Sequence, residues 1–296
     1  MTDWQDLSAR GGLAGHHLVG WLMWDRAAID AYADLGIEEG RGWVVAWRVA
    51  ALGDASPAVA AAATYSIHPN VVEFVMNLYR GVATAEQILA VRDTAIEPAL
   101  RDIAPEVAEG LGALATDLWR GVDVVHHGAR TMFQAHRARP RPDTIDSCLS
   151  GWLAANCLRE LRGDNHWALC AAADLDDVEV GLLHAAMVDV DEYGGEEWIA
   201  RSRGADDAAV SRGWERLEAK GFAEGARLSE TGRQFRQGLE RRTDALCVDA
   251  WKAVGAEAAE AYCELIERNQ QAFKQRIDDT AGPRWMPAVR VVEESG

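Results

Sequence analysis

The sequence has few of the features that mark several common protein classes. Its five cysteines are an odd number and form no Cys-x-x-Cys pair. Neither a disulfide framework nor a zinc knuckle is therefore indicated, and reduced, mostly buried thiols are expected. Only 30 basic residues stand against 47 acidic ones, which gives a formal charge of -17. Because that balance repels the phosphate backbone, nucleic acid is an unlikely partner.

Long apolar runs are also missing. No stretch approaches the roughly 20 consecutive apolar residues that a membrane span needs. The opening residues, "MTDWQDLSARGG", lack the basic region followed by an apolar region that a secretory signal contains. We expect a soluble, cytoplasmic protein with no membrane partner.

The best-known catalytic motifs are absent as well. No GxGxxG or GxxxxGK[ST] loop marks a nucleotide cofactor, and no GxSxG marks a nucleophilic serine. Eight histidines raise the alternative of a metal site, but neither HExxH nor the paired ExxH of helical di-iron proteins occurs. We assign no metal site, and the cofactor stays unknown.

What the sequence does contain is helical periodicity. Apolar residues recur every three or four positions over most of the chain, which predicts a mainly α protein, a multi-helix bundle. The proline-rich stretch "RARPRPDT" cannot continue a helix and indicates an internal boundary. The expected parts are an N-terminal helical domain (1–140), a helical pair (141–174), a winged-helix-like module (175–246), and a C-terminal helix with an extended tail (247–296).

Residues 176–244 interrupt the plain helical pattern. Two helical segments precede a third that ends at Gly221, a turn follows at Gly225, and "LSETGR" leads into a long amphipathic helix. This order resembles the multiple-antibiotic-resistance type of winged helix. The resemblance implies an embedded module with a small β-hairpin.

The charges of the third helix in this module do not favour DNA. A reading helix needs basic side chains to reach bases and phosphates. Here acids and bases are mixed along the segment: Asp206, Asp207, Glu215 and Glu218 stand beside Arg212, Arg216 and Lys220. We therefore expect a packing or dimerisation module, with Trp214 and Leu217 as apolar contacts and a homodimer as a possible assembly. A regulator that binds an operator is the alternative.

The stretch "LRELRGDNHWALC" (158–170) carries many ionisable groups where a turn between two helices is expected. Gly163 would end one helix, Asp164 would cap the next, and the arginines would satisfy the last carbonyls or pair with Glu160. Capping does not explain His166, which has apolar neighbours, or His184, which lies on an apolar stripe. The alternative is a cavity where imidazoles transfer protons and guanidinium groups hold an anion.

The same stretch resembles a largely uncharacterised actinobacterial family of helical proteins with a helix-turn-helix segment. The matching residues are Arg159, Arg162, Gly163, Asp164, His166 and His184. The chain departs from the family pattern at Leu161 and Asn165, where histidine and glycine are usual. A fainter match in "GWVVAWRVAALGD" adds Arg48. The resemblance implies a fold and does not imply a general activity.

A second polar set lies in the N-terminal half. His17 precedes the aromatic stretch "GWLMW", and His68 precedes a proline. Trp47 belongs to a set of tryptophans at helical spacing that could wall a pocket for a flat ligand or lie in the core: Trp21, Trp24, Trp43 and Trp47.

Three functions remain. The first is an enzyme of small-molecule or specialised metabolism with a pocket in the helical half. Its proposed catalytic residues are His166, His184 and Asp164, and its proposed substrate-binding residues are Arg48, Arg159, Arg162, His17, His68 and Trp47. The second is a ligand-sensing winged-helix regulator. The third is a noncatalytic binding or scaffold protein.

Overall fold

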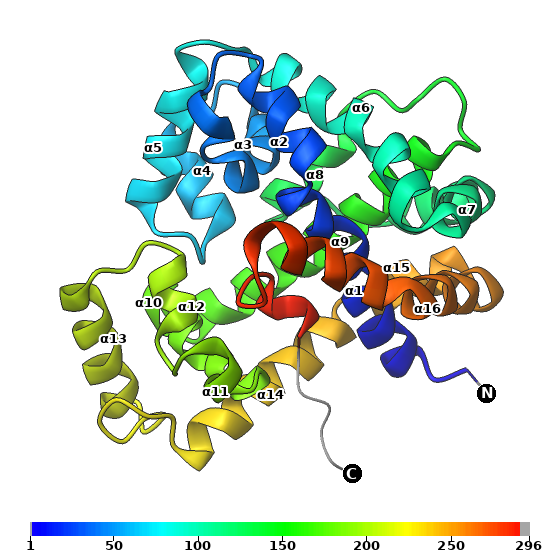
Figure 1. The fold of residues 1–296 in the computed structure, drawn as a ribbon. Helices are drawn as coiled ribbons and strands as arrows, with labels where there is room; N and C mark the ends of the chain where they lie inside the picture. The colour runs from blue at the N-terminus through cyan, green and yellow to red at the C-terminus, as the bar shows by residue number, and fades with distance from the viewer. Residues whose placement is uncertain (1, 291–296) are drawn as a thin grey trace.

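The computed structural model describes residues 2–290, which fold almost entirely as helices (Figure 1). The prediction of a mainly α protein is confirmed. The first helices along the chain are α1 (Trp4–Gly20), α2 (Arg26–Ala33), α3 (Trp43–Val49), α4 (Pro57–Thr64), α5 (Pro69–Arg80), α6 (Ala85–Ile103), α7 (Pro105–Asp123) and α8 (Thr131–Arg137). The later ones are α9 (Cys148–Ala172), α10 (Asp177–Leu183), α11 (Val190–Tyr193), α12 (Trp198–Ser202), α13 (Asp207–Ala219), α14 (Glu230–Ala245), α15 (Val248–Val254) and α16 (Ala256–Ala281).

The buried apolar residues form two main clusters. The large core combines α1 to α8 and the first half of α9 with α15 and α16. The ends of the chain thus share this core, and α1 lies against α16 (Figure 1). The second core extends from Cys170, near the end of α9, to Leu239 in α14. The segment 177–245, called the small module below, is built around this second core.

Helix α9 connects the two cores, and it corrects one prediction. Residues 148–172 form a single helix, without the expected turn at Gly163. Gly163 is not among the glycines with positive φ, so it does not take the left-handed conformation of a helix stop. Since the first half of α9 packs in the large core and its end packs in the second, tertiary packing outweighs the low helix propensity of one glycine.

The small module contains a three-helix arrangement in which α10 packs against both α12 and α13. Asp206 caps α13 by accepting the Ala209 N–H at 2.7 Å, and the left-handed Gly221 follows its last turn. The expected β-hairpin is reduced, within the described residues, to one antiparallel bridge between Ala223 and Leu228. Both segments of that bridge are too short to count as strands.

The two faces of α13 differ. Trp214 and Leu217 are buried in the second core, so their apolar contacts lie inside the small module. Two basic side chains at its C-terminal end are paired with the buried Glu179: Arg216 Nε lies 3.1 Å from Glu179 Oε2, and Nζ of the C-cap residue Lys220 lies 2.7 Å from Glu179 Oε1. A carboxylate therefore offsets part of the positive charge of these two bases.

The expected extended tail is described only as far as Arg290. There it forms turns and a short 3₁₀ helix, Pro287–Val289, in place of an extended chain, and residues 291–296 lie outside the described residues. No helix among those described is long and apolar enough to cross a membrane.

Candidate functional site

A buried carboxylate, Glu160, lies at the centre of the first charged group on α9. Arg48 from α3 approaches it with two nitrogens, Nε at 3.0 Å and Nη2 at 2.8 Å, and Arg159 Nη1 lies 2.7 Å from Oε1. Burial alone would raise the pKa of Glu160, but the charges of Arg48 and Arg159 outweigh it and hold the pKa well below its ordinary value. This confirms that Arg159 pairs with Glu160.

Asp164 caps a helix, but not the one expected. Its carboxylate accepts the backbone N–H of Phe133 at 2.8 Å and that of Met132 at 3.4 Å. Asp164 therefore caps the beginning of α8 from its position on the neighbouring helix α9. Burial raises its pKa to about 7, against the opposing hydrogen bond from Phe133. This carboxyl group therefore takes up a proton at a higher pH than an ordinary aspartate does.

The second charged group joins α9 to α14. Arg162 contacts both Glu240 and Asp244, with its Nε 3.0 Å from Asp244 Oδ1. Arg236 Nη1 lies 2.5 Å from the other Glu240 oxygen. Gly12 on α1 leaves room for this arrangement, because a Cβ there would lie 2.6 Å from Arg162 Cδ.

Two histidines flank this second group in opposite tautomers. Thr243 Oγ1 donates its only hydrogen to the Leu239 carbonyl at 2.7 Å, so the 2.9 Å contact with His166 Nδ1 requires that nitrogen to donate. His166 Nε2 is then an acceptor. Arg236 can only donate, so His184 Nδ1, at 3.3 Å, accepts, and Nε2 carries the hydrogen.

Both imidazoles are held neutral. Burial and then the charge of Arg236 lower the pKa of His166 to about 3, and they lower the pKa of His184 well below its ordinary value. Within the described part of the chain, the Nε2 hydrogen of His184 and the Nε hydrogen of Arg236 are buried without a hydrogen-bond partner. Unused donors therefore collect beside Arg236.

Arg203 adds an arginine without a carboxylate. It follows α12 in the turn that leads to α13, and its carbonyl accepts the His68 N–H at 3.0 Å. No carboxylate of residues 2–290 forms an ion pair with its guanidinium. Burial, and then the charges of Arg236 and Arg48, lower its pKa to about 10. Arg203 is thus near enough to both arginines to be repelled by them.

Counting charges shows an excess of arginine. We call Arg48, Arg159, Arg162, Arg203 and Arg236 the arginine cluster. These five guanidinium groups are accompanied by four carboxyl groups, those of Glu160, Asp164, Glu240 and Asp244. With five guanidinium groups against at most four carboxylates, the cluster has a surplus of at least one positive charge, although the chain as a whole carries -17.

The structure brings together six of the nine residues predicted for the site: Arg48, Arg159, Arg162, Asp164, His166 and His184. His17 lies elsewhere, where burial and the charges of Lys274 and Arg290 lower its pKa to about 3. His68 caps α5 through Nδ1, which accepts the Asn70 N–H. Trp47 is fully buried in the large core, where its ring and that of His136 form an edge-to-face pair with centroids 6.5 Å apart. The other tryptophans of that set also contribute to the large core.

Sequence reasoning missed the contribution of α14 and of Arg203. Arg236, Glu240 and Thr243 lie on one face of α14, at spacings of four and three residues. That spacing was a usable signal, because it places a base, an acid and a hydroxyl in register on an otherwise polar helix. Arg203 gave no such signal, because an arginine in a turn is usually solvated.

No other chemistry is evident at the cluster. The described residues contain no group of three or more histidine, cysteine or acidic side chains that could hold a metal ion. The five cysteines are free and buried, as expected. Burial raises the pKa of Cys157 and Cys170 to about 12, which makes both thiols poor nucleophiles.

Comparison with known proteins gives one result. The sequence profile described as a helix-turn-helix family matches residues 13–278, which is most of the chain. No curated protein matches. No solved structure matches either.

Proposed function

The chain belongs to a helix-turn-helix family, and on that premise we propose that it binds a small anion in the arginine cluster and responds to it through the small module. The observation that carries the proposal is Arg203. It is a partly buried arginine with no carboxylate partner in residues 2–290, it lies in the turn between α12 and α13, and Arg236 and Arg48 repel it.

An anion would relieve this repulsion. Buried charges are stabilised only when they are paired and hydrogen bonded. Arg203 would supply the guanidinium, while Arg236 Nε and His184 Nε2 would supply donors that are otherwise unused. A carboxylate or a phosphate group suits these donors, because guanidinium groups bind both in bidentate fashion.

The position of the cluster supports a response in the small module. Arg48 lies on α3, whose apolar residues pack in the large core. His184 and Arg236 belong to the small module, and Arg203 lies in the turn that precedes α13. An anion that pulls Arg203 toward Arg48 would change the contact between the two parts. A ligand shifts a conformational equilibrium only through such differential contacts.

The experiment compares two arginines of the small module. We expect inorganic phosphate to raise the melting temperature of the wild type, and we expect Arg203→Gln to bind phosphate at least about tenfold more weakly by calorimetry. The control is Arg212→Gln, since Arg212 is exposed on α13. It should bind like the wild type. Equal affinity of Arg203→Gln and the wild type would remove the basis of the proposal.

The winged-helix interpretation belongs to the same proposal. A single β-bridge stands where a wing would lie, and the family match is consistent with a DNA-binding regulator. The pairing of Arg216 and Lys220 with Glu179 engages two of the bases that could contact phosphates. We therefore propose a ligand-responsive module that binds DNA weakly in the state described. The homodimer stays a prediction.

An acid–base enzyme is the second candidate. It is favoured by His166, whose Nε2 is an acceptor close enough to Arg236 and Arg162 for their charges to act on it. A pKa of about 3 makes that imidazole a weak base, and a bound anion would raise it. Nitrogen NMR of His166 with and without phosphate tests this candidate. A pKa that stays near 3 in both samples would exclude His166 as a general base.

A further inference from the structure

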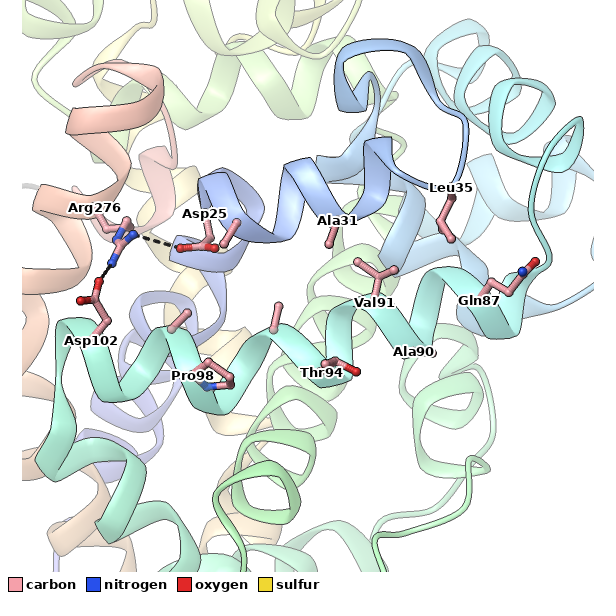
Figure 2. A pocket seen from close by; sticks show the side chains of 13 residues that line it. Asp25, Ala31, Leu35, Gln87, Ala90, Val91, Thr94, Pro98, Asp102 and Arg276 are labelled. Carbon is pink, nitrogen blue, oxygen red and sulfur yellow. Dashed lines mark hydrogen bonds and ion pairs between the residues drawn. The ribbon is translucent and has the colours of Figure 1, made fainter.

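A separate pocket lies between α2 and α6, with the side chain of Arg276 from α16 at one end (Figure 2). Its volume is about 620 Å³, within the range of small-molecule sites. The lining is mostly apolar and includes Ala31, Leu35, Val91 and Ala95. The pocket shares no residue with the arginine cluster, so it needs its own explanation.

The pocket is an elongated groove. It follows one face of α6 from Gln87 to Asp102, and at 1.5 Å per residue that is about 22 Å. An extended alkyl chain matches an elongated, mostly apolar lining of this kind.

Charge distinguishes the two ends. At one end Arg276 Nη1 lies 3.2 Å from Asp25 Oδ2, and Nη2 contacts Asp102 (Figure 2). Two carboxylates therefore share one guanidinium, which leaves this end negative. Asp25 is fully buried and also caps α2 through the Ala28 N–H at 3.0 Å. The Asp102 side chain is 71% exposed, so it can contact a ligand.

We propose that this pocket binds an amphiphilic cation, a molecule with one long alkyl chain and an ammonium head. The chain lies along the alanine-rich groove between α2 and α6, and the head lies beside Asp102. Burial of methylene groups supplies most of the affinity. The negative end selects the sign of the head group. This inference does not depend on the proposed anion site.

The first test compares three probes with the same chain. Dodecylammonium, dodecanol and dodecanoate are titrated by calorimetry below their micelle concentrations, at low and at high salt. We expect dodecylammonium to bind at least about tenfold more tightly than dodecanoate. The ratio of the two affinities should be smaller at high salt, because salt screens the charge at the Asp102 end of the pocket. Equal or tighter binding of dodecanoate overturns the proposal, and so does the absence of binding by all three.

Matched variants locate the probe. Ala31→Phe places a ring in the middle of the groove and should weaken dodecylammonium at least about tenfold. Ala62→Phe is its control, because Ala62 is an exposed alanine of α4 outside the pocket. Binding that survives Ala31→Phe, or that both variants abolish equally, overturns the location.

A second pair tests the charged end. Asp102→Asn should remove most of the preference for dodecylammonium over dodecanol, while Asp249→Asn, at a carboxylate 93% exposed on α15, should leave it unchanged. A preference unaffected by Asp102→Asn overturns the assigned head-group contact. Phosphate should not compete with dodecylammonium, which separates this test from that of the anion site.

Discussion

Asp164 shows how one side chain can cap a helix to which it does not belong. Its carboxylate reaches from α9 to the N–H groups of Met132 and Phe133 at the start of α8. Asn keeps one acceptor at that distance, whereas Ser is too short to reach. We therefore expect Asp164→Asn to be mild and Asp164→Ser to cost as much as Asp164→Ala, about 1–2 kcal/mol in urea unfolding. If Ser restored full stability, the cap would have to lie within α9 itself.

His166 makes stability depend on pH. The pKa of His166 is about 3 in the folded chain, and its ordinary value, which applies to the unfolded chain, is 6.5. Because the unfolded chain takes up the proton first, this contribution is complete above pH 6.5 and is lost as the pH falls toward 3. Between pH 7 and pH 5 the loss amounts to at most about 2 kcal/mol.

Asp164 acts in the opposite direction, since its pKa rises to about 7 on folding. The His166 contribution is therefore measured as a difference. We expect the free energy of unfolding of His166→Gln, relative to that of the wild type, to rise by up to about 2 kcal/mol between pH 7 and pH 5 in urea unfolding. The same change in both proteins would mean that His166 titrates normally in the folded chain.

At the scale of helices, Gly163 and Gly151 of α9 predict opposite results. A Cβ on Gly163 would meet its nearest neighbours at 3.7 and 3.8 Å, which is ordinary contact, so Gly163→Ala should stabilise by about 0.5–1 kcal/mol through helix propensity. A Cβ on Gly151 would lie 2.2 Å from the Leu111 carbonyl oxygen, so Gly151→Ala should destabilise strongly. Thermal unfolding measures both. If Gly163→Ala destabilised the protein, the result would support the helix end at Gly163 that was expected from the sequence.

The helices themselves could largely be predicted, because the three-and-four spacing of apolar residues follows directly from burial of one face. The continuity of α9 could not. A glycine before an aspartate is the usual signature of a stop and a cap, and only the packing of both ends of α9 decides against it. In the same way, sequence indicated that Asp164 caps a helix but could not indicate which one.

For the whole molecule, net charge and the position of bases on α13 predict weak binding to DNA. With a charge of -17, and with Arg216 and Lys220 held by Glu179, the ligand-free protein should give no mobility shift with random duplex at physiological salt. A complex whose affinity falls linearly with the logarithm of salt concentration would contradict this. It would also favour the operator-binding regulator.

The candidate site could be predicted only in part, because it assembles from five separated segments. The residues on α9 share one quoted stretch, and His184 and Arg48 followed from the family resemblance. Arg203 and Arg236 join them only when the small module packs against the large core. The amino-acid composition shows that acidic residues outnumber basic ones in the whole chain. It cannot show that five arginines and only four carboxyl groups come together at one place in the fold.

The length of α9 has a mechanical consequence. A helix of 25 residues is about 37 Å long. A rotation of about 5° at the end held in the large core therefore moves the other end by about 3 Å, which is as long as a whole hydrogen bond. That far end of α9 is packed in the second core. A tilt of α9 that is too small to repack the large core would therefore still displace the small module.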